Sequence, residues 1–351
     1  MVESAGVAAS VTRLRERSAV ADVPRRARDR GIGRMVLRRI AFVVPLLGVV
    51  SVGLFALASR SPFDPLAGYL GDRYLTASDA DKARIAAELG VDDPWWAQYG
   101  RWIGGVLSGD LGISRSFGMP VVDVVTQRLP WTMLLGITGL VVAAALALVL
   151  GVMAGVRPRG AIDRIVSPFA TIVASTPPFV LSLVAIGVLA LGLGWLPTGG
   201  LTAPGEDPTP GAVARHLVLP AAVLALSQVP WLLMAVRQSA RAAMASDAVL
   251  GARARGIPER TIVRRHVVPT ALAPFVTVIG LRLPELVVGA AIVEEVFSWP
   301  GLAGAVVTSA RELDFPLLAV LTLGTTLVVL LGSLLADIAY VRLDPRVRAD
   351  A

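Results

Sequence analysis

The sequence predicts an all-α protein with six transmembrane helices, and two observations indicate this fold class. Of the 351 residues, 55% are hydrophobic and the mean hydropathy is +0.69, which is more apolar than a soluble globular chain. Six apolar runs are each about as long as the 20 residues that a bilayer-spanning helix needs. These runs lie near residues 40–58, 132–156, 166–193, 217–236, 270–293 and 317–340.

The composition also excludes several kinds of site. With no cysteine the chain has no disulfide and no thiolate metal ligand, and its two histidines, His216 and His266, argue against a multi-histidine metal or haem centre. The net charge of +7 is spread over separate loops, which argues against nucleic-acid binding. No G-x-x-x-x-G-K-[ST] loop and no nucleophile–base–orienter set occurs, so we expect no ATP hydrolysis, no other catalysis and no cofactor in this chain.

Residues 1–34 and 35–59 are predicted to be a basic cytoplasmic tail and the first transmembrane helix. The tail is rich in arginine and alanine and lacks apolar periodicity, so we expect it to be disordered or bound at the surface of anionic lipid. A cleaved signal peptide is the alternative. The apolar run 40–58 exceeds a signal core and no clear small-residue cleavage site follows it, which favours an uncleaved helix.

The longest polar stretch, 60–131, is predicted to be an extracytoplasmic excursion between the first two spans. Helices are expected at about 79–89 and 94–107, between proline and glycine residues. The second of these helices carries aromatic residues at helical spacing, which favours anchoring at the membrane interface over a ligand site. The aromatic residues are Trp95, Trp96, Tyr99 and Trp102.

Residues 132–340 are predicted to form the transmembrane core, with spans two to six. Pro177 and Pro178 interrupt the third span, and Pro220 and Pro230 the fourth. Interrupted helices survive in a membrane where they face protein or a water-filled cavity, so the breaks are consistent with a translocation path. Kinked helices are also common in inert bundles, and both interpretations stay open.

The distribution of charge assigns the loops to two sides of the membrane. The tail, 157–165, 237–266 and 341–351 together carry more than twice as many basic residues as the loops that would lie opposite. By the positive-inside rule, both termini and the segment 237–266 are expected in the cytoplasm. Residues 341–351 are then a short cytoplasmic tail.

Residues 246–269 are the longest basic segment between the apolar runs of the second half, and they predict two short helices around a glycine hinge. The first residue, a serine, can cap the first helix, and Gly256 can adopt the left-handed conformation that ends it. Pro258 suits the start of the second helix, which Arg264 and Arg265 would end. A soluble partner could grip such a hairpin, while an ordinary basic loop is the alternative.

This segment resembles the signature of ABC importer permeases, which is E-A-A, three residues, G, nine residues and I-x-L-P. Here the pattern reads Leu250-Gly251-Ala252, three residues, Gly256, nine residues and His266-x-Val268-Pro269. The spacing from glycine to proline and the third small residue are kept. Leucine replaces the glutamate, and histidine replaces the isoleucine.

Three further stretches are similar to the dipeptide/oligopeptide/nickel group of this family. They are LGVDDPWWAQYGRWIGGVLSGDLGISRSFGMPVVDVVTQRLPWTMLL, GAAIVEEVFSWPGLAGAVVTSARELDFPLL and the closing ADIAYVRLDPRVR. The similarities extend from about residue 36 to 348. The resemblance implies the type I ABC importer fold and uptake of dipeptides or oligopeptides, with nickel, haem or glutathione as alternative solutes.

The resemblance also implies partners and contact residues. We expect a homologous second permease subunit, two cytoplasmic ATPase subunits that bind ATP and Mg, and an extracytoplasmic substrate-binding protein, all at the bacterial plasma (inner) membrane. In this family the ATPases grip the hairpin, and their closure moves the membrane helices. The residues expected at that contact are Ala252, Arg253, Ala254, Arg255, Gly256, Ile257 and Pro258.

Arg282 and Glu285, in the fifth span, are candidates for the translocation path, together with Pro177 and Pro178. A charge inside a membrane is costly and usually functional. The i, i+3 spacing of the two charged residues also allows a structural ion pair within the bundle, so both roles stay open. A stand-alone secondary transporter is the competing class, and the lack of an evident internal repeat argues against it.

Overall fold

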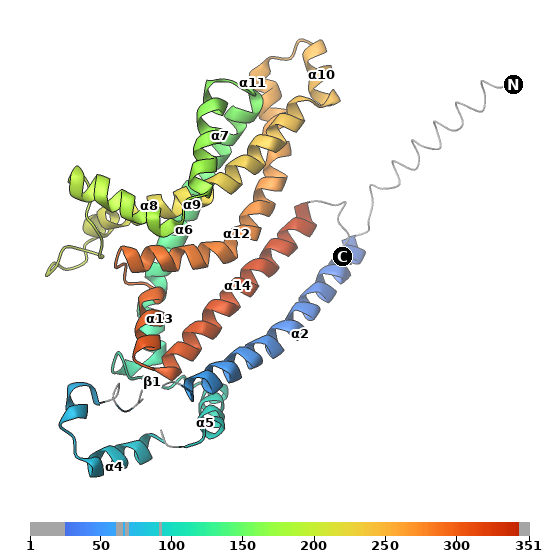
Figure 1. Ribbon diagram of the computed structural model, residues 1–351. Coiled ribbons are helices and arrows are strands. Elements are labelled where there is room, and N and C mark those ends of the chain that lie inside the picture. The colour runs from blue at the N-terminus through green and yellow to red at the C-terminus, as the bar shows by residue number, and fades with distance from the viewer. Residues whose placement is uncertain (1–24, 61–65, 67–69, 91–92, 344–351) are drawn as a thin grey trace.

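The computed structural model describes residues 25–60, 66, 70–90 and 93–343, and these are almost entirely helical (Figure 1). Most of the predicted N-terminal tail and most of the C-terminal tail lie outside the described residues. In chain order the elements are α2 (Arg25–Ala58), η2 (Gly71–Leu75), α4 (Asp79–Leu89), α5 (Trp95–Ser108), β1 (Ile113–Ser114), β2 (Met119–Pro120), α6 (Val121–Val156), α7 (Ala161–Ala174), α8 (Pro178–Ala185), η3 (Ile186–Gly192), α9 (Pro210–Met244), α10 (Asp247–Ala254), α11 (Glu259–Ile262), η4 (Val263–Val267), α12 (Val268–Val296), α13 (Leu302–Arg311) and α14 (Phe315–Leu343).

Five helices in the described part of the chain are long and apolar enough to cross a membrane. They include most of α2, all of α6 and α9, the stretch Glu259–Leu283 and the first two thirds of α14. A sixth candidate is α7 followed by α8 and η3, a pair that is bent by 110°. The predicted all-α fold with six spans is confirmed when this bent pair is counted as one span.

Prolines act differently in the third and fourth spans. Pro177 and Pro178 lie at the bend, where Pro178 opens α8, so the predicted interruption is present. The interruption expected at Pro220 and Pro230 is wrong, because α9 runs through both residues without a break. Both prolines of α9 are buried, and packing against α6 and α12 holds this helix together where its own backbone bonds are missing.

The second span begins earlier than hydropathy predicts. The expected excursion ends at residue 131, but α6 already starts at Val121, so its first three turns lie within the predicted excursion. Val121 and Val124 are buried against Leu317 and Leu321 of α14, and this packing supports the helix before the long apolar run begins. Within the excursion, α4 and α5 match the two predicted helices to within one residue.

Helices α6 and α9 pack closely along a row of small residues. On α6 this row repeats every fourth position, as Gly139, Ala143, Ala147, Gly151 and Gly155, all buried. A Cβ atom on Gly155 would lie 2.6 Å from the Arg237 carbonyl oxygen, and one on Gly151 would lie 2.8 Å from the Cβ of Val236. The backbones therefore approach as closely as small-residue seams allow between membrane helices.

The first span lies against the last one and supports the excursion. Arg39 of α2 forms an ion pair with Asp337 of α14, and its Nη2 donates to the Ser333 hydroxyl at 3.0 Å. At the far end of α2, Phe55 contacts the ring of Tyr99 edge-on, with centroids 5.4 Å apart. Part of the aromatic cluster on α5 is thus packed on the first span, whereas Trp96 is 63% exposed. Anchoring of this cluster at the membrane interface stays a prediction.

The two polar parts of the protein lie at opposite ends of the bundle. Figure 1 shows α4, α5 and the short hairpin β1–β2 at one end, and α10 and α11 at the other. The helix α8 and the loop that follows it project sideways between these ends, whereas α7 runs along the bundle toward α10 and α11 (Figure 1). The fold therefore presents two separate polar surfaces, one at each end.

Candidate functional site

The protruding hairpin, residues 246–269, is built by strong local signals. The hydroxyl of Ser246 accepts a hydrogen bond from the Val249 N–H at 3.4 Å and caps α10 as predicted. After α10 the chain reverses at Gly256, whose φ of +71° lies in the left-handed region that favours glycine. Pro258 then precedes the first residue of α11. The hairpin has the helix–glycine–helix form that the sequence predicts.

A small core holds the two limbs of the hairpin together. Val249 and Ala252 of α10 and Ile262 of α11 are fully buried, and Ile257 packs against them. Of the seven predicted contact residues, Ala252 thus faces inward and is covered by the hairpin itself. Its small side chain serves the packing of the limbs, because a larger one would separate them.

An ion pair closes the open side of the hairpin. Nε of Arg253 donates to Oε1 of Glu259 at 2.6 Å, and Nη2 donates to Oε2 at 3.3 Å. This bidentate geometry suits a guanidinium and a carboxylate, and the hydrogen bond raises the pKa of Arg253. Arg253 is therefore partly engaged within the hairpin, although it remains at the surface.

The outer surface of the hairpin is small, basic and open. Ala254, Arg255, Gly256 and Pro258 are exposed, and no atom lies within 4 Å of where a Cβ on Gly256 would be. Leu250, which replaces the glutamate of the resembling pattern, is 54% exposed on the same hairpin. A partner can approach the backbone closely here and meet a guanidinium and an apolar side chain at its edges.

The second limb does not end where the sequence predicts. Arg264 and Arg265 were expected to end a short helix, but α11 continues through the π-helical segment η4 into α12 without a break. Val267 is buried against Ala240 and Ala243 of α9, and this apolar contact keeps the chain helical through the arginines. The second limb of the hairpin is consequently continuous with α12, and its end packs against the end of α9.

Below the hairpin, a buried ion pair ties α7 to α9. Asp163 is 5% exposed and accepts hydrogen bonds from Nε of Arg237 at 2.5 Å and from Nη2 at 3.1 Å. It also accepts from the Arg159 N–H and the Ser167 hydroxyl, both at 2.8 Å. Sequence reasoning missed this pair. The only signal was one aspartate at the start of an apolar helix.

The opposite end carries a second group that sequence reasoning missed. Nε1 of Trp299 donates to the Trp131 carbonyl at 3.0 Å, and Nη1 of Arg128 donates to the Gly301 carbonyl at 3.2 Å. Glu294 is buried directly beneath this loop, where its carboxyl carbon would lie 2.2 Å from a Cβ on Gly301. The loop between α12 and α13 is thereby fixed to the start of α6.

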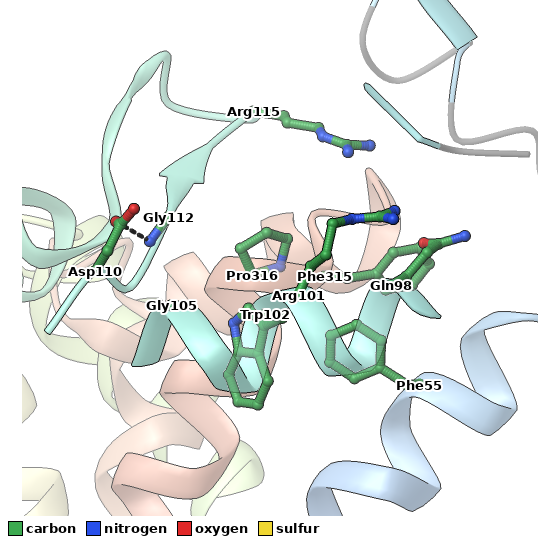
Figure 2. A pocket seen from close by; sticks show the side chains of 10 residues that line it. All are labelled: Phe55, Gln98, Arg101, Trp102, Gly105, Asp110, Gly112, Arg115, Phe315 and Pro316. Carbon is green, nitrogen blue, oxygen red and sulfur yellow. Dashed lines mark hydrogen bonds between the residues drawn. The ribbon is translucent and has the colours of Figure 1, made fainter. Parts of the chain in front are cut away.

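A cavity of about 240 Å³ lies at this same end, between α5, the start of α14 and the loop at β1 (Figure 2). Nη1 of Arg101 is held by Asp93 at 2.6 Å. The Nε1 of Trp102 is buried and has no hydrogen-bond partner among the described residues. The lining residues are Phe55, Gln98, Arg101, Trp102, Gly105, Asp110, Gly112, Arg115, Phe315 and Pro316.

The residues predicted for a translocation path occupy separate places. Pro177 and Pro178 lie at the bend before α8. Arg282 lies on α12, where its guanidinium carbon is 4.0 Å from the centroid of the Trp231 ring on α9. The side chain of Glu285 lies outside the described residues, so the predicted Arg282–Glu285 ion pair stays a prediction.

The fold and its two polar ends define a multi-pass helical membrane protein with a rigid hairpin at one end. Comparison with known families makes this specific, because residues 147–349, more than half of the chain, match the model of the binding-protein-dependent transport system inner membrane component. The chain belongs to this family. It is a membrane permease subunit of an ABC importer in the inner membrane.

Named relatives cover nearly the whole chain. An oligopeptide transport system permease protein of Bacillus subtilis is 32% identical over 89% of this chain and 98% of its own length. A putative peptide permease protein of Brucella suis is 31% identical over 90% of this chain and 99% of its own. A solved amino acid ABC transporter covers 63% of this chain and 94% of its own, with 16% identity and a TM-score of 0.48.

Proposed function

We propose that this chain forms part of the path by which an ATP-driven importer takes up dipeptides or oligopeptides that an external binding protein delivers. The protruding hairpin is the observation that carries the proposal. It is continuous with the membrane helix α12 and packs against the end of α9, and it presents a surface onto which a soluble partner can close. The peptide substrate follows from the names of the relatives, two of which are peptide permeases.

The hairpin converts movement of the ATPases into movement of the bundle. Displacing the surface around Gly256 displaces α10 and α11 together, because their shared core and the Arg253–Glu259 pair hold them as one body. That body continues into α12 and contacts the end of α9. Rigid-body movement of packed helices is a common way to open a path alternately to either side.

Partner subunits supply the ATP hydrolysis, the second half of the path and the substrate capture that this chain does not provide. Two ATPase subunits bind ATP and Mg and hydrolyse the nucleotide, so this chain is not itself an enzyme. A homologous second permease encloses the other side of the path. The binding protein docks at the end that carries α5 and the cavity beside it, where the polar groups around Arg101 and Trp102 are available to it.

The hairpin and both termini lie in the cytoplasm in this proposal. The chain contains no cysteine, so a single introduced cysteine reports its own location without background. Arg260→Cys, at an exposed hairpin position, is expected to react with a membrane-impermeant thiol reagent only in inside-out vesicles. Ser108→Cys, exposed at the end of α5, is the matched control and is expected to react only in right-side-out vesicles. The reverse pattern would overturn the orientation.

Replacing Gly256 tests the coupling role directly. Gly256→Arg is expected to reduce co-purification of the ATPase and peptide-stimulated ATP turnover at least tenfold, because a long side chain fills the open surface that the partner must approach. The measurements are subunit stoichiometry after purification and the ATPase rate in proteoliposomes with binding protein and peptide.

Two further variants separate blocking of the surface from backbone strain. Gly256→Asn accepts the left-handed conformation with a short side chain and is expected to retain most activity. Ala254→Arg adds bulk at an exposed helical position without strain and is expected to lose activity as Gly256→Arg does. Unchanged association and turnover in both arginine variants would remove the hairpin from the ATPase contact.

A further inference from the structure

The ends of α6, α7 and α9 that lie toward the hairpin carry many arginines and a single carboxylate. Figure 1 shows that α7 begins at the end of the bundle that also carries α10 and α11. In the proposed orientation this end meets the cytoplasmic surface of the membrane. The charged residues within 150–176 and 232–246 are Arg157, Arg159, Arg164, Arg237, Arg241 and Asp163.

The carboxylate does not neutralise the exposed arginines. Asp163 is buried, and its two oxygens accept hydrogen bonds from the guanidinium of Arg237. A Cβ on Gly155 would lie 3.2 Å from the Arg241 backbone nitrogen, so the end of α6 brings Arg241 close to the α6–α7 turn. In the part of the chain that the structure describes, the four remaining arginines are exposed and in no ion pair. They are Arg157, Arg159, Arg164 and Arg241.

The turn between α6 and α7 holds two of these arginines on a fixed backbone. The Gly160 N–H donates to the Arg157 carbonyl at 3.0 Å, and the Arg159 N–H donates to Oδ2 of Asp163 at 2.8 Å. Arg159 has a φ of +62°, in the left-handed region, and its bond to the buried Asp163 keeps it there. Neighbouring guanidinium groups offer planar sets of N–H donors, which match the oxygens of a phosphate.

An exposed apolar face follows directly after Arg164 on α7. Ile165, Phe169 and Ile172 lie at the i, i+4 and i+7 positions and therefore share one side of the helix. Their exposure ranges from 49% for Phe169 to 70% for Ile165. Positive charge that adjoins an apolar stripe matches the two parts of an anionic phospholipid, whereas an acidic surface on a soluble partner would not need the stripe.

We propose that the α6–α7 turn and the adjoining face of α7 bind an anionic phospholipid. Arg157 and Arg159 bind the headgroup phosphate, and the acyl chains lie along the apolar face of α7. Arg164 and Arg241 add positive charge, which favours an anionic headgroup over a zwitterionic one. This lipid site goes beyond the proposed importer function and does not depend on which solute is carried.

The absence of native cysteine allows a test that reports on the lipid beside α7. A fluorescent label is attached to Ile172→Cys in the purified transporter complex, which is placed in bilayers that mix phosphatidylglycerol and phosphatidylcholine. Quenching by brominated forms of each lipid gives the preference for the anionic lipid at the label. We expect a preference of about fivefold or more, which is the contribution of a single arginine near a membrane surface. Combining Arg157→Gln with Arg159→Gln is expected to abolish this preference.

Two controls separate a defined site from general attraction between charges. Val141→Cys is 60% exposed on α6 and lies about four turns before Arg157, so a label there is expected to show no preference between the two lipids. Arg264→Gln with Arg265→Gln removes two exposed charges at the same end of the bundle. This double variant is expected to leave the preference at Ile172→Cys unchanged.

The possible outcomes either support the lipid site or overturn it. A preference at Ile172→Cys that depends on Arg157 and Arg159 would support it. Equal losses in the two double variants would indicate diffuse attraction and overturn the site, as would a label at Ile172→Cys that neither lipid quenches, because protein would then cover α7.

Two further measurements keep the lipid site apart from the proposed function. Loss of ATPase co-purification in the Arg157→Gln, Arg159→Gln variant, with an unchanged lipid preference, would assign these arginines to the ATPase and overturn the site. ATP-dependent dipeptide uptake is measured with the transporter that carries none of these substitutions. Its absence would contradict the importer proposal, whereas the lipid preference at α7 would still support the lipid site.

Discussion

Asp163→Ala is expected to lower the free energy of unfolding by about 3 kcal/mol, which is the lower end of the range for breaking a buried ion pair by removing one partner. The reason is the environment of the charge that remains. Arg237 lies mostly buried with its Nε and Nη2 directed at the missing carboxylate, and the Arg159 N–H and the Ser167 hydroxyl lose an acceptor as well. The measurement is the thermal unfolding midpoint of the purified complex in detergent.

Asp123→Ala is the matched control for that variant. Both aspartates lie in the first turn of a helix, but Asp123 is exposed and is in no described ion pair. Its loss is expected to cost only about 0.3–1 kcal/mol, which is the value of a carboxylate at a helix N-terminus. Equal midpoint shifts for the two variants would contradict the structural role of the Asp163–Arg237 pair.

In the proposed coupling mechanism, the Asp163–Arg237 pair also contributes to transmission of movement. It joins the start of α7 to α9 just below the contact of Val267 with Ala240 and Ala243. A force on the hairpin therefore reaches α9 at a point where α9 is also tied to the third span. Asp163→Ala is expected to reduce peptide-stimulated ATP turnover more than it reduces binding of the ATPase.

Much of the fold can be predicted from hydropathy and from the residues that favour helix caps and turns. Apolar runs near 20 residues identify the spans because a bilayer imposes that length. Ser246 and Gly256 are predictable since capping and a left-handed φ each depend on a residue and its immediate neighbours. Local signals of this kind need no knowledge of the rest of the molecule.

Features that depend on packing between segments far apart in the sequence cannot be predicted from local signals. Asp163 and Arg237 are 74 residues apart, and nothing in either neighbourhood indicates the other. The inward side of α10, and with it the burial of Ala252, depends on where α11 lies. Pro220 and Pro230 are tolerated within α9 because α6 and α12 pack against this helix, whereas Pro177 and Pro178 lie at the bend between α7 and α8.

Trp231 shows the same limit at the candidate path. A tryptophan in an apolar run reads as an ordinary membrane residue, and Arg282 lies 51 positions away in another span. Only the contact between α9 and α12 makes them one group. The small residues on α6 recur at every fourth position, a pattern that our sequence analysis did not single out, and nothing near them in the sequence indicates their partner on α9.

The small residues of α6 that contact α9 give the second prediction with a large effect. Glycine-to-alanine substitutions along α6 are expected to lower the stability of the protein by different amounts. Gly155→Ala is expected to be the most harmful, because the new methyl group would meet the Arg237 carbonyl oxygen at 2.6 Å and backbone atoms cannot rotate away. Gly139→Ala would meet side-chain atoms of Leu224 at 2.9 Å and no backbone atom, so less of the main chain has to move. Overpacking of this kind costs about 1–3 kcal/mol, so Gly155→Ala should approach the upper figure and Gly139→Ala the lower one.

Gly136 supplies the control on the same helix, since a Cβ there would meet nothing within 4 Å. Gly136→Ala is expected to be neutral or to stabilise by up to about 1 kcal/mol, because alanine favours the helix more than glycine does. The thermal midpoints of the three variants in detergent therefore order as Gly136, Gly139 and Gly155, from highest to lowest. If all three shifted equally, the effect would belong to helix propensity alone, and the close contact between α6 and α9 would not be what holds the bundle together.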